Sequence, residues 1–130
     1  MKKVRGYIFS RPFQGERVPQ HVQNIVIRDY CNKAGLQYLL SATEYAMNDS
    51  HLIFEQILDE LPEIDGIIPY SLFQLPVDSE HRAKIYNRIL SIKKTCYFAV
   101  EGLKLCNQED SERIENIWKI KLTLPYCLNY

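Results

Sequence analysis

A chain of 130 residues with 46% hydrophobic residues is long enough for one hydrophobic core and too short for two, so we expect a single domain over residues 1–130. Its 16 basic and 16 acidic residues balance, which excludes the strongly basic surface of a dedicated nucleic-acid binder. No apolar stretch approaches the roughly 20 residues of a membrane-spanning helix, so we expect neither a nucleic-acid nor a membrane partner.

The chain opens with a predicted strand over residues 3–9, because β-branched and aromatic residues form a nearly continuous apolar run that stops at Ser10. A polar loop follows to about residue 18. Pro19 suits the first position of a helix, whose apolar residues recur at helical spacing up to Gly35, a typical C-cap. Residues 36–40 then form a short second strand.

The later elements continue this alternation of strands and helices. Polar residues 48–50 are candidates to cap a helix that Pro62 stops. A third strand covers residues 67–70, and Pro69 should end its ladder because proline donates no hydrogen bond. Asp78 or Ser79 caps a third helix, and residues 95–100 form a fourth strand.

The last segment, residues 111–124, fits both helical and strand spacing. A helix is favoured because no turn residue separates Glu115 from Trp118. Strands that alternate with helices of 10–15 residues predict a mainly parallel sheet with helices on both faces. We therefore expect an α/β fold, a three-layer sandwich with four to five strands.

The carboxyl ends of parallel strands meet at one edge of the sheet, here called the crest, where α/β proteins bind ligands. Arginine and a free helix N-terminus both favour an anionic group. Glu44 and Ser10 are the best candidates for acid–base or nucleophilic chemistry, and His21 is a weaker candidate for a base beside Ser10. The predicted site is: catalytic, Ser10 and Glu44; ligand-binding, Arg11, Arg17, Gln20, His21, Ser71, Gln74 and Glu101.

Charge is uneven along the chain. Residues 1–35 carry seven Lys/Arg against two acidic residues, whereas residues 36–70 carry seven acidic residues and no Lys or Arg. This asymmetry predicts a positive potential around the first loop and helix, unless neighbouring segments cancel it.

The cysteines, Cys31, Cys96, Cys106 and Cys127, form no C-x-x-C pair, and the chain starts without the apolar stretch of a secretion signal. These features indicate reduced thiols and a cytoplasmic location. The histidines lack metal-ligand spacing and no glycine-rich nucleotide motif is present, so we expect no metal and no cofactor.

Two family resemblances accompany these patterns. The segment Gly6-Tyr7-Ile8-Phe9-Ser10, with Leu72-Phe73-Gln74-Leu75 further on, resembles the catalytic domain of serine recombinases. The resemblance implies a resolvase-like or flavodoxin-like fold and a nucleophilic role for Ser10. Arginines that precede the serine and follow the leucine in that family have no counterpart here, so we do not expect DNA cleavage.

A second resemblance covers nearly the whole chain and is to the sporadic carbohydrate cluster proteins, a small bacterial family. It rests on residues 5–12, 15–24, 40–47 and 70–76. The resemblance implies a place in cell-surface carbohydrate biosynthesis without implying a reaction.

Three functions remain open at this stage. The first is binding or modification of a small anionic or sugar-bearing metabolite at the crest. The second is a noncatalytic module that assembles pathway enzymes, for which the third helix or the segment around Trp118 would have to expose an apolar patch. The third is a degenerate recombinase-like protein that handles nucleic acid. We also expect a homodimer, the commonest assembly of such chains.

Overall fold

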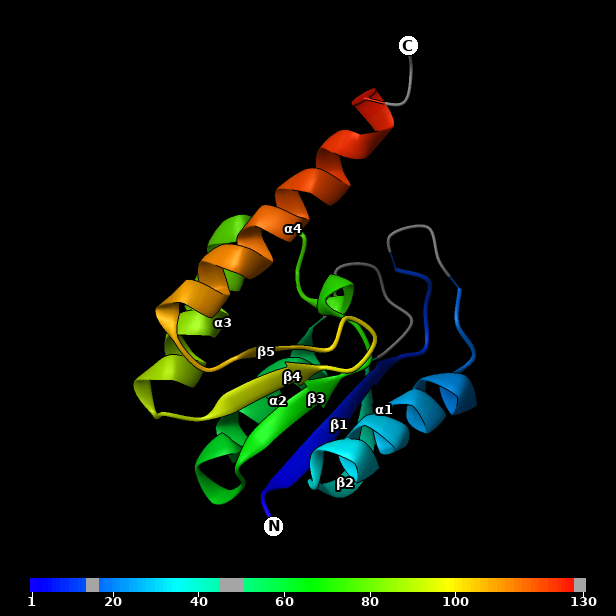
Figure 1. Ribbon diagram of the computed structural model, residues 1–130, viewed down its shortest axis with the longest axis vertical. Helices are drawn as coiled ribbons and strands as arrows, with labels where there is room; N and C mark the ends of the chain where they lie inside the picture. Colours follow the sequence, from blue (N-terminus) through cyan, green and yellow to red (C-terminus); the bar gives the residue numbers. More distant parts are fainter. Residues whose placement is uncertain (14–16, 45–50, 128–130) are drawn as a thin grey trace.

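The computed structural model describes the backbone of residues 1–13, 17–44 and 51–127, and side chains in these ranges as far as residue 122. Within them lies one five-stranded sheet of order β2-β1-β3-β4-β5 (Figure 1). The strands are β1 (Lys3–Phe9), β2 (Gln37–Glu44), β3 (Gly66–Pro69), β4 (Thr95–Phe98) and β5 (Leu103–Leu105). The first four run parallel and β5 is antiparallel to β4, which confirms the predicted α/β class with a mainly parallel sheet.

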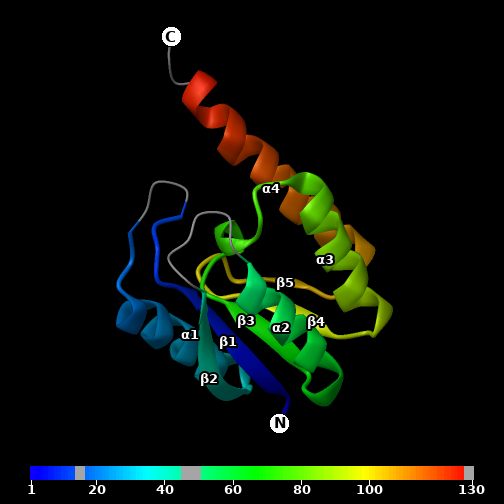
Figure 2. The same ribbon diagram turned by 180° about the vertical axis from the view of Figure 1, so that it is seen from behind.

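Helices cover both faces of this sheet (Figures 1 and 2). On one face, α1 (Gln20–Ala34) packs through Ile27 and Cys31 against side chains of β1, β3 and β4. On the other face, the main core joins the sheet to α2 (Leu52–Glu60), α3 (Ser79–Ser91) and α4 (Gln108–Cys127). Alternate residues of β1 supply the two cores, since Val4 and Ile8 face α1 whereas Tyr7 and Phe9 face α2.

The helix ends follow the sequence signals. Gly35 closes α1 in the left-handed conformation at φ 70°. Asp78 caps α3 by accepting a hydrogen bond from the Glu80 amide. Pro62 lies in a short 3₁₀ helix, Leu61–Glu63, that ends α2. The segment after residue 108 is the favoured helix, and no described helix is both long and apolar enough to cross a membrane.

Two strand predictions are wrong, and β4 also ends at Phe98 instead of at the predicted residue 100. β2 continues to Glu44 instead of ending at residue 40, because it is an edge strand that carries polar residues and shifts register opposite Gly6. A Cβ on Gly6 would lie 2.1 Å from Ser41 Oγ, so this close approach requires glycine. β5 was not anticipated, since three residues after Gly102 carry too little pattern to recognise.

Ion pairs with α2 cancel part of the uneven charge along the sequence. Arg5 of β1 forms a two-point ion pair with Glu60 of α2. Arg88 of α3 binds both Glu55 and Asp59 of α2. Glu55, Asp59 and Glu60, three of the seven acidic residues between positions 36 and 70, therefore hold α2 against its basic neighbours.

A buried arginine fixes α3 against α4. Arg82 donates to the Glu115 carboxylate at 2.8 and 2.9 Å and to the backbone oxygens of Pro76 and Val77, and it lies over the Trp118 ring. The Tyr86 hydroxyl donates to the same carboxylate. Burial alone would raise the pKa of Glu115, but the hydrogen bonds from Arg82 and Tyr86 outweigh it and hold the pKa below its usual value.

The lowered pKa predicts how stability depends on pH. A carboxyl whose pKa is lower in the folded state stabilises the fold above its unfolded pKa of about 4.3 and loses that contribution as the pH falls further. We expect Glu115→Gln to lower the free energy of unfolding by about 1.5–3 kcal/mol at neutral pH. The difference from the unaltered protein should shrink below about pH 4. Urea unfolding across pH measures both, with the exposed Glu112→Gln as control; a pH-independent difference contradicts this account.

Candidate functional site at the crest

Ser10 lies beside Glu44 where β1 and β2 end. The Ser10 amide donates to the Glu44 backbone oxygen at 3.3 Å, and the Ser10 hydroxyl donates to the same oxygen at 2.7 Å. The serine residue as a whole is exposed. In this arrangement the hydroxyl proton is held by a backbone carbonyl, which is not a general base.

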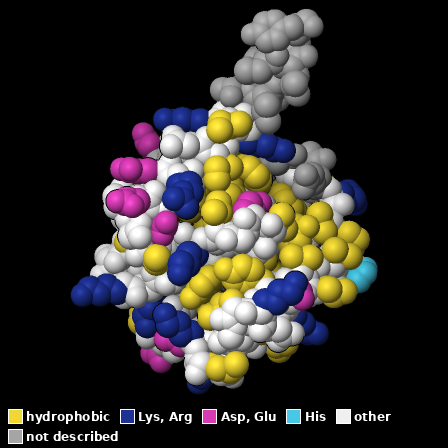
Figure 3. Space-filling view, in the orientation of Figure 1, with side chains coloured by type: hydrophobic (Ala, Val, Ile, Leu, Met, Phe, Trp, Pro, Cys, Tyr) yellow, Lys and Arg dark blue, Asp and Glu magenta, His cyan; other side chains and the backbone are white. Residues whose placement is uncertain are grey.

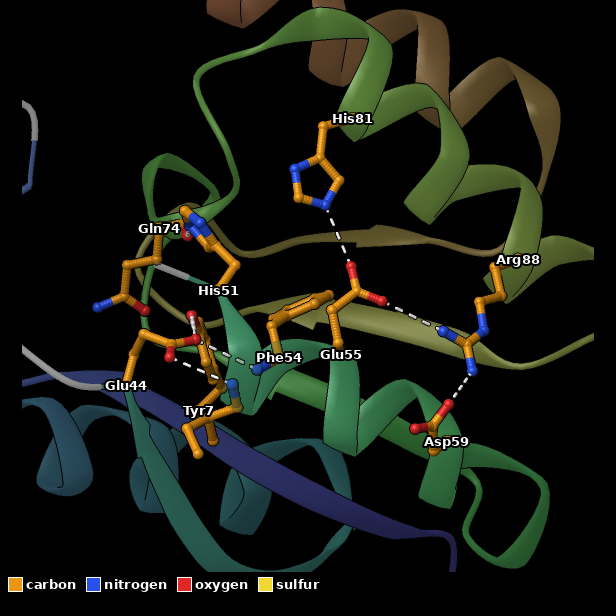
Figure 4. A network of polar contacts seen from close by, with 10 residues as sticks. Tyr7, Glu44, His51, Phe54, Glu55, Asp59, Gln74, His81 and Arg88 are labelled. Atoms are coloured by element: carbon orange, nitrogen blue, oxygen red, sulfur yellow. Dashed lines mark hydrogen bonds and ion pairs between the residues drawn. The ribbon is translucent and has the colours of Figure 1, made fainter. Parts of the chain in front are cut away.

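The Glu44 side chain is 0% exposed and acts as a structural anchor (Figure 4). Its carboxylate accepts hydrogen bonds from the Tyr7 hydroxyl at 2.8 Å and from the Ile53 and Phe54 amides at 3.2 Å. These amides belong to the first turn of α2, which has no cap from its own N-cap residue His51. Glu44 therefore caps α2 from a neighbouring strand, where a negative charge also suits the helix dipole.

Burial and the neighbouring carboxylate raise the pKa of Tyr7 well above its usual value. The phenol consequently stays protonated and remains a donor to Glu44. Through Glu44, Tyr7 of β1 is joined to the end of β2 and to the start of α2. The prediction that Glu44 faces a ligand as an acid or base is not what the geometry favours, because three donors already surround its carboxylate.

Gln23, which was not among the predicted site residues, forms hydrogen bonds with three other residues at the crest, and we call this cluster the hub. Its Oε1 accepts from the Phe9 amide at 3.0 Å, and its Nε2 donates to the backbone oxygens of Phe9 at 3.0 Å and Val18 at 2.9 Å. The side chain thus pairs with β1 as a neighbouring strand would. A clue was present in the sequence, since Gln23 shares the buried stripe of α1 with Ile27 and Cys31.

Gln74 extends this chain of amides. Its Nε2 donates to Gln23 Oε1 at 2.8 Å, and its backbone oxygen contacts Nε2 of His51 at 3.1 Å. The Gln74 side chain is 0% exposed. Its Oε1 is one of two buried side-chain polar atoms without a hydrogen-bond partner among the described residues, the other being Nε1 of Trp118.

Ser71 and Glu101 bind each other. The Ser71 hydroxyl donates to one Glu101 carboxylate oxygen at 2.7 Å, and the Leu72 amide donates to the other at 2.9 Å. Ser71 Oγ also accepts from the Phe73 amide and so caps the short helix Leu72–Gln74. The two predicted ligand-binding residues therefore also shape the loop that carries Gln74.

The predicted basic loop is only partly joined to this cluster. The Arg11 guanidinium lies 4.2 Å over the Phe9 ring, close to the crest. Arg17, Gln20 and His21 are exposed at the start of α1. That helix has no side-chain cap and no acidic residue in its first turn, so its N-terminus keeps the positive character predicted for it. The Ser10 hydroxyl donates to Glu44 and is not paired with His21.

Metal-binding geometry is absent from the described part of the chain, where no group of three or more His, Cys, Asp or Glu residues comes together. The polar groups at the crest are amides, hydroxyls, carboxylates and a guanidinium, and most of them bind one another.

The fold is that of the catalytic domain of serine recombinases. Two solved structures share it: the N-terminal catalytic domain of TP901-1 integrase, with a TM-score of 0.65, 14% identity and coverage of 97% of this chain and 99% of that chain; and a resolvase family site-specific recombinase from Streptococcus pneumoniae, with a TM-score of 0.67, 8% identity and 96% coverage of each chain. At these identities the likeness concerns the fold alone.

Searches of protein-family models and of curated proteins find no match. The resemblance to serine recombinases is thus confirmed at the level of the fold. The resemblance to the sporadic carbohydrate cluster proteins has no support beyond the stretches quoted above.

The geometry predicts that Glu44 matters for stability. In Glu44→Gln an amide NH₂ would face a backbone N–H of α2 or the Tyr7 hydroxyl, so the free energy of unfolding should fall by about 1.5–3 kcal/mol. The exposed Glu63→Gln serves as control and should change it by less than about 0.5 kcal/mol. Urea unfolding measures both. If Glu44→Gln were as stable as the control, the cap would be unimportant and a reactive role would regain support.

Proposed function

We propose that the protein binds a small polyhydroxylated ligand with an anionic group at the crest. The observation that carries this proposal is the buried Gln74 Oε1, an acceptor without a donor among the described residues. Leaving such an atom unpaired costs about 1–3 kcal/mol. A ligand or water that supplies a donor recovers this energy, and a ligand without one is rejected.

The orientation of this acceptor is fixed by the backbone. Gln23 Oε1 must face the Phe9 N–H and Gln23 Nε2 must face the Phe9 carbonyl oxygen. Gln74 must then turn its amino group toward Gln23 Oε1. Rotating the Gln74 amide by 180° would place two oxygens against each other, so Oε1 is held on the side away from Gln23, where it can accept a hydrogen bond from a hydroxyl or a water.

The basic side of the crest suits an anion. Arg11 holds a planar guanidinium against the Phe9 ring, and α1 begins without an acidic residue in its first turn. Arginine and free helix N–H groups both favour phosphate or carboxylate. Sugar phosphates, sugar acids and nucleotide sugars combine hydroxyl donors with such a group, and the quoted resemblance supports a place for them in surface-carbohydrate biosynthesis.

Transfer of DNA strands has less support. Of the described arginines, Arg5, Arg82 and Arg88 are bound to carboxylates. A serine nucleophile at a phosphodiester needs cationic groups aimed at the phosphate. We therefore propose that the protein uses a recombinase-like fold to bind a ligand.

The first test replaces the unpaired acceptor. Gln74→Met keeps the approximate shape of the side chain and removes Oε1, so a ligand from a panel of sugar phosphates, sugar acids and nucleotide sugars should bind about 5- to 150-fold more weakly. Unfolding without ligand should change by no more than about 1 kcal/mol. Calorimetric titration measures binding, with the exposed Gln56→Met of α2 as control. Equal binding by unaltered protein and Gln74→Met contradicts the proposal, as does a panel that gives no binding.

The second test concerns the anionic group. Arg11→Ala should weaken binding of the same ligand by about 1.5–3 kcal/mol, the range for a hydrogen bond to a charged group. Arg11→Lys should recover part of the loss, because lysine keeps the charge and lacks the planar fork. Thermal melts check that the variants fold. If Arg11→Ala and Arg17→Ala both bind with unchanged affinity, the anionic group lies elsewhere.

A further inference from the structure

The outer side of β2 is an open strand edge. Among the described strands, β2 is eight residues long, lies at one end of the sheet and pairs with β1 alone. The backbone groups on its other side form a template with which a strand of another chain could pair. Leu40 of β2 is 74% exposed, so solvent reaches this edge.

The side chains of β2 give this edge little protection. Proteins often protect an edge strand with lysine or proline, and β2 contains neither. Its one charged residue, Glu44, is buried where it caps α2. We therefore looked for protection in the backbone of the strand.

A bulge interrupts the edge in the middle of β2. Leu40 and Ser41 together lie opposite Gly6, where the register between β1 and β2 shifts. A Cβ on Gly6 would clash with Ser41 Oγ, so the bulge requires glycine at this position.

Two side chains bind the peptide group that joins Leu40 to Ser41. From the side of α2, Arg5 Nη1 donates to the Leu40 oxygen at 2.9 Å, while the rest of the guanidinium binds Glu60. From the side of α1, the Tyr38 hydroxyl accepts from the Ser41 amide at 3.0 Å. The carbonyl and the N–H of one peptide group point in opposite directions. The two hydrogen bonds therefore fit a single orientation of this group, across the sheet instead of along its plane.

The Tyr38 hydroxyl is itself held in place. It donates its one proton to Asn24 Oδ1 of α1 at 3.2 Å, so Ser41 Oγ is the donor in the contact of 2.7 Å between the two hydroxyls. Together with the Ser41 amide, these contacts use its one donor and both of its acceptor positions. The Tyr38 ring packs against the core beneath α1.

We propose that Arg5 and Tyr38 hold this bulge in place and thereby prevent the edge of β2 from pairing with a strand of another chain. A partner strand needs a row of N–H and C=O groups that lie in the plane of the sheet. In the middle of β2 this row is interrupted, because Tyr38 binds the Ser41 N–H and Arg5 binds the Leu40 oxygen. The homodimer predicted from the sequence would accordingly use a surface other than this edge.

Protection of this edge matters because the protein also exposes apolar side chains, which favour association. Figure 3 shows hydrophobic side chains gathered on one face of the molecule. The patches that the sequence suggested do not contribute to this exposure. Trp118 is 0% exposed and packs in the main core, and the apolar residues Ile85, Tyr86 and Ile89 of α3 are buried there too. The prediction that α3 or the segment around Trp118 exposes an apolar patch is therefore wrong for these residues.

Hydrogen exchange tests the bond between Tyr38 and Ser41. Tyr38→Phe keeps the ring and removes the acceptor of the Ser41 N–H, so the Ser41 amide should exchange with solvent at least about tenfold faster than in the unaltered protein. The control Tyr30→Phe removes a hydroxyl from α1 and should leave this exchange unchanged. Nuclear magnetic resonance measures both variants. Equal exchange in Tyr38→Phe and the unaltered protein would show that Tyr38 does not hold the bulge.

Sedimentation velocity tests the consequence for association. Arg5→Met combined with Tyr38→Phe releases both halves of the peptide group, so this double variant should form assemblies that grow with protein concentration. Tyr38→Phe alone should do so to a smaller extent. The control Glu60→Gln removes the ion pair of Arg5 and leaves its contact with the Leu40 oxygen in place, so it should sediment as the unaltered protein does. Circular dichroism checks that each variant is folded.

A further substitution separates pairing at the edge from a general loss of stability. Leu40→Lys places a charge on the exposed edge, so adding it to the double variant should restore the sedimentation of the unaltered protein. If the double variant does not fold, Tyr38→Phe with and without Leu40→Lys gives the same comparison.

Three results would overturn the proposal. The first is a folded double variant and a Tyr38→Phe variant that both sediment as the unaltered protein does. The second is association of Glu60→Gln as strong as theirs, and the third is association that Leu40→Lys leaves unchanged. Since these measurements need no ligand, they are independent of the binding tests at the crest.

Discussion

The side-chain amide of Gln23 holds together the end of β1, the loop before α1 and the loop before α3. The amide accepts from the Phe9 N–H and donates to the backbone oxygens of Phe9 and Val18. A side chain of α1 thus forms with β1 the hydrogen bonds that a neighbouring strand would form. Because the Phe9 backbone offers one donor and one acceptor, the Gln23 amide has one possible orientation. Its Oε1 then requires a donor from Gln74, which fixes the orientation of the Gln74 amide as well. The orientation of the buried acceptor at the crest is therefore a consequence of the fold, and this acceptor has no hydrogen-bond donor among the described residues.

The polar side chains at the ends of β1 and β2 form hydrogen bonds within the protein. The serine at the end of β1 donates to a backbone oxygen, and the glutamate beside it caps a helix. Three described arginines are bound by carboxylates of neighbouring helices. A likeness in fold therefore does not assign strand transfer to this chain, because function depends on the groups placed at the strand ends and not on the sheet that places them.

Much of the fold could be predicted from the sequence because the spacing of apolar residues and the residues that end helices and strands indicate the same elements in β1, α1 and α3. Pro19, Gly35 and Asp78 mark helix ends through local backbone chemistry. The end of β2 and the whole of β5 were missed, since an edge strand tolerates polar residues and a three-residue strand has no period. At the crest, the sequence predicts that Ser10, Glu44 and Gln74 lie near strand ends, as they do in the structure, whereas Gln23 was missed because its polar role needs partners far apart in sequence. The burial of Glu44 also depends on such a contact, with α2.

Nuclear magnetic resonance of the glutamine side-chain amides tests the central claim most directly. Both Nε2 protons of Gln23 are engaged by backbone oxygens, so they should exchange with solvent much more slowly than those of the exposed Gln108. The Gln74 amide should be protected as well and should be the glutamine resonance that shifts most when a ligand binds. Exchange of the Gln23 amide as fast as that of Gln108 would show that the hub does not form and would contradict the account.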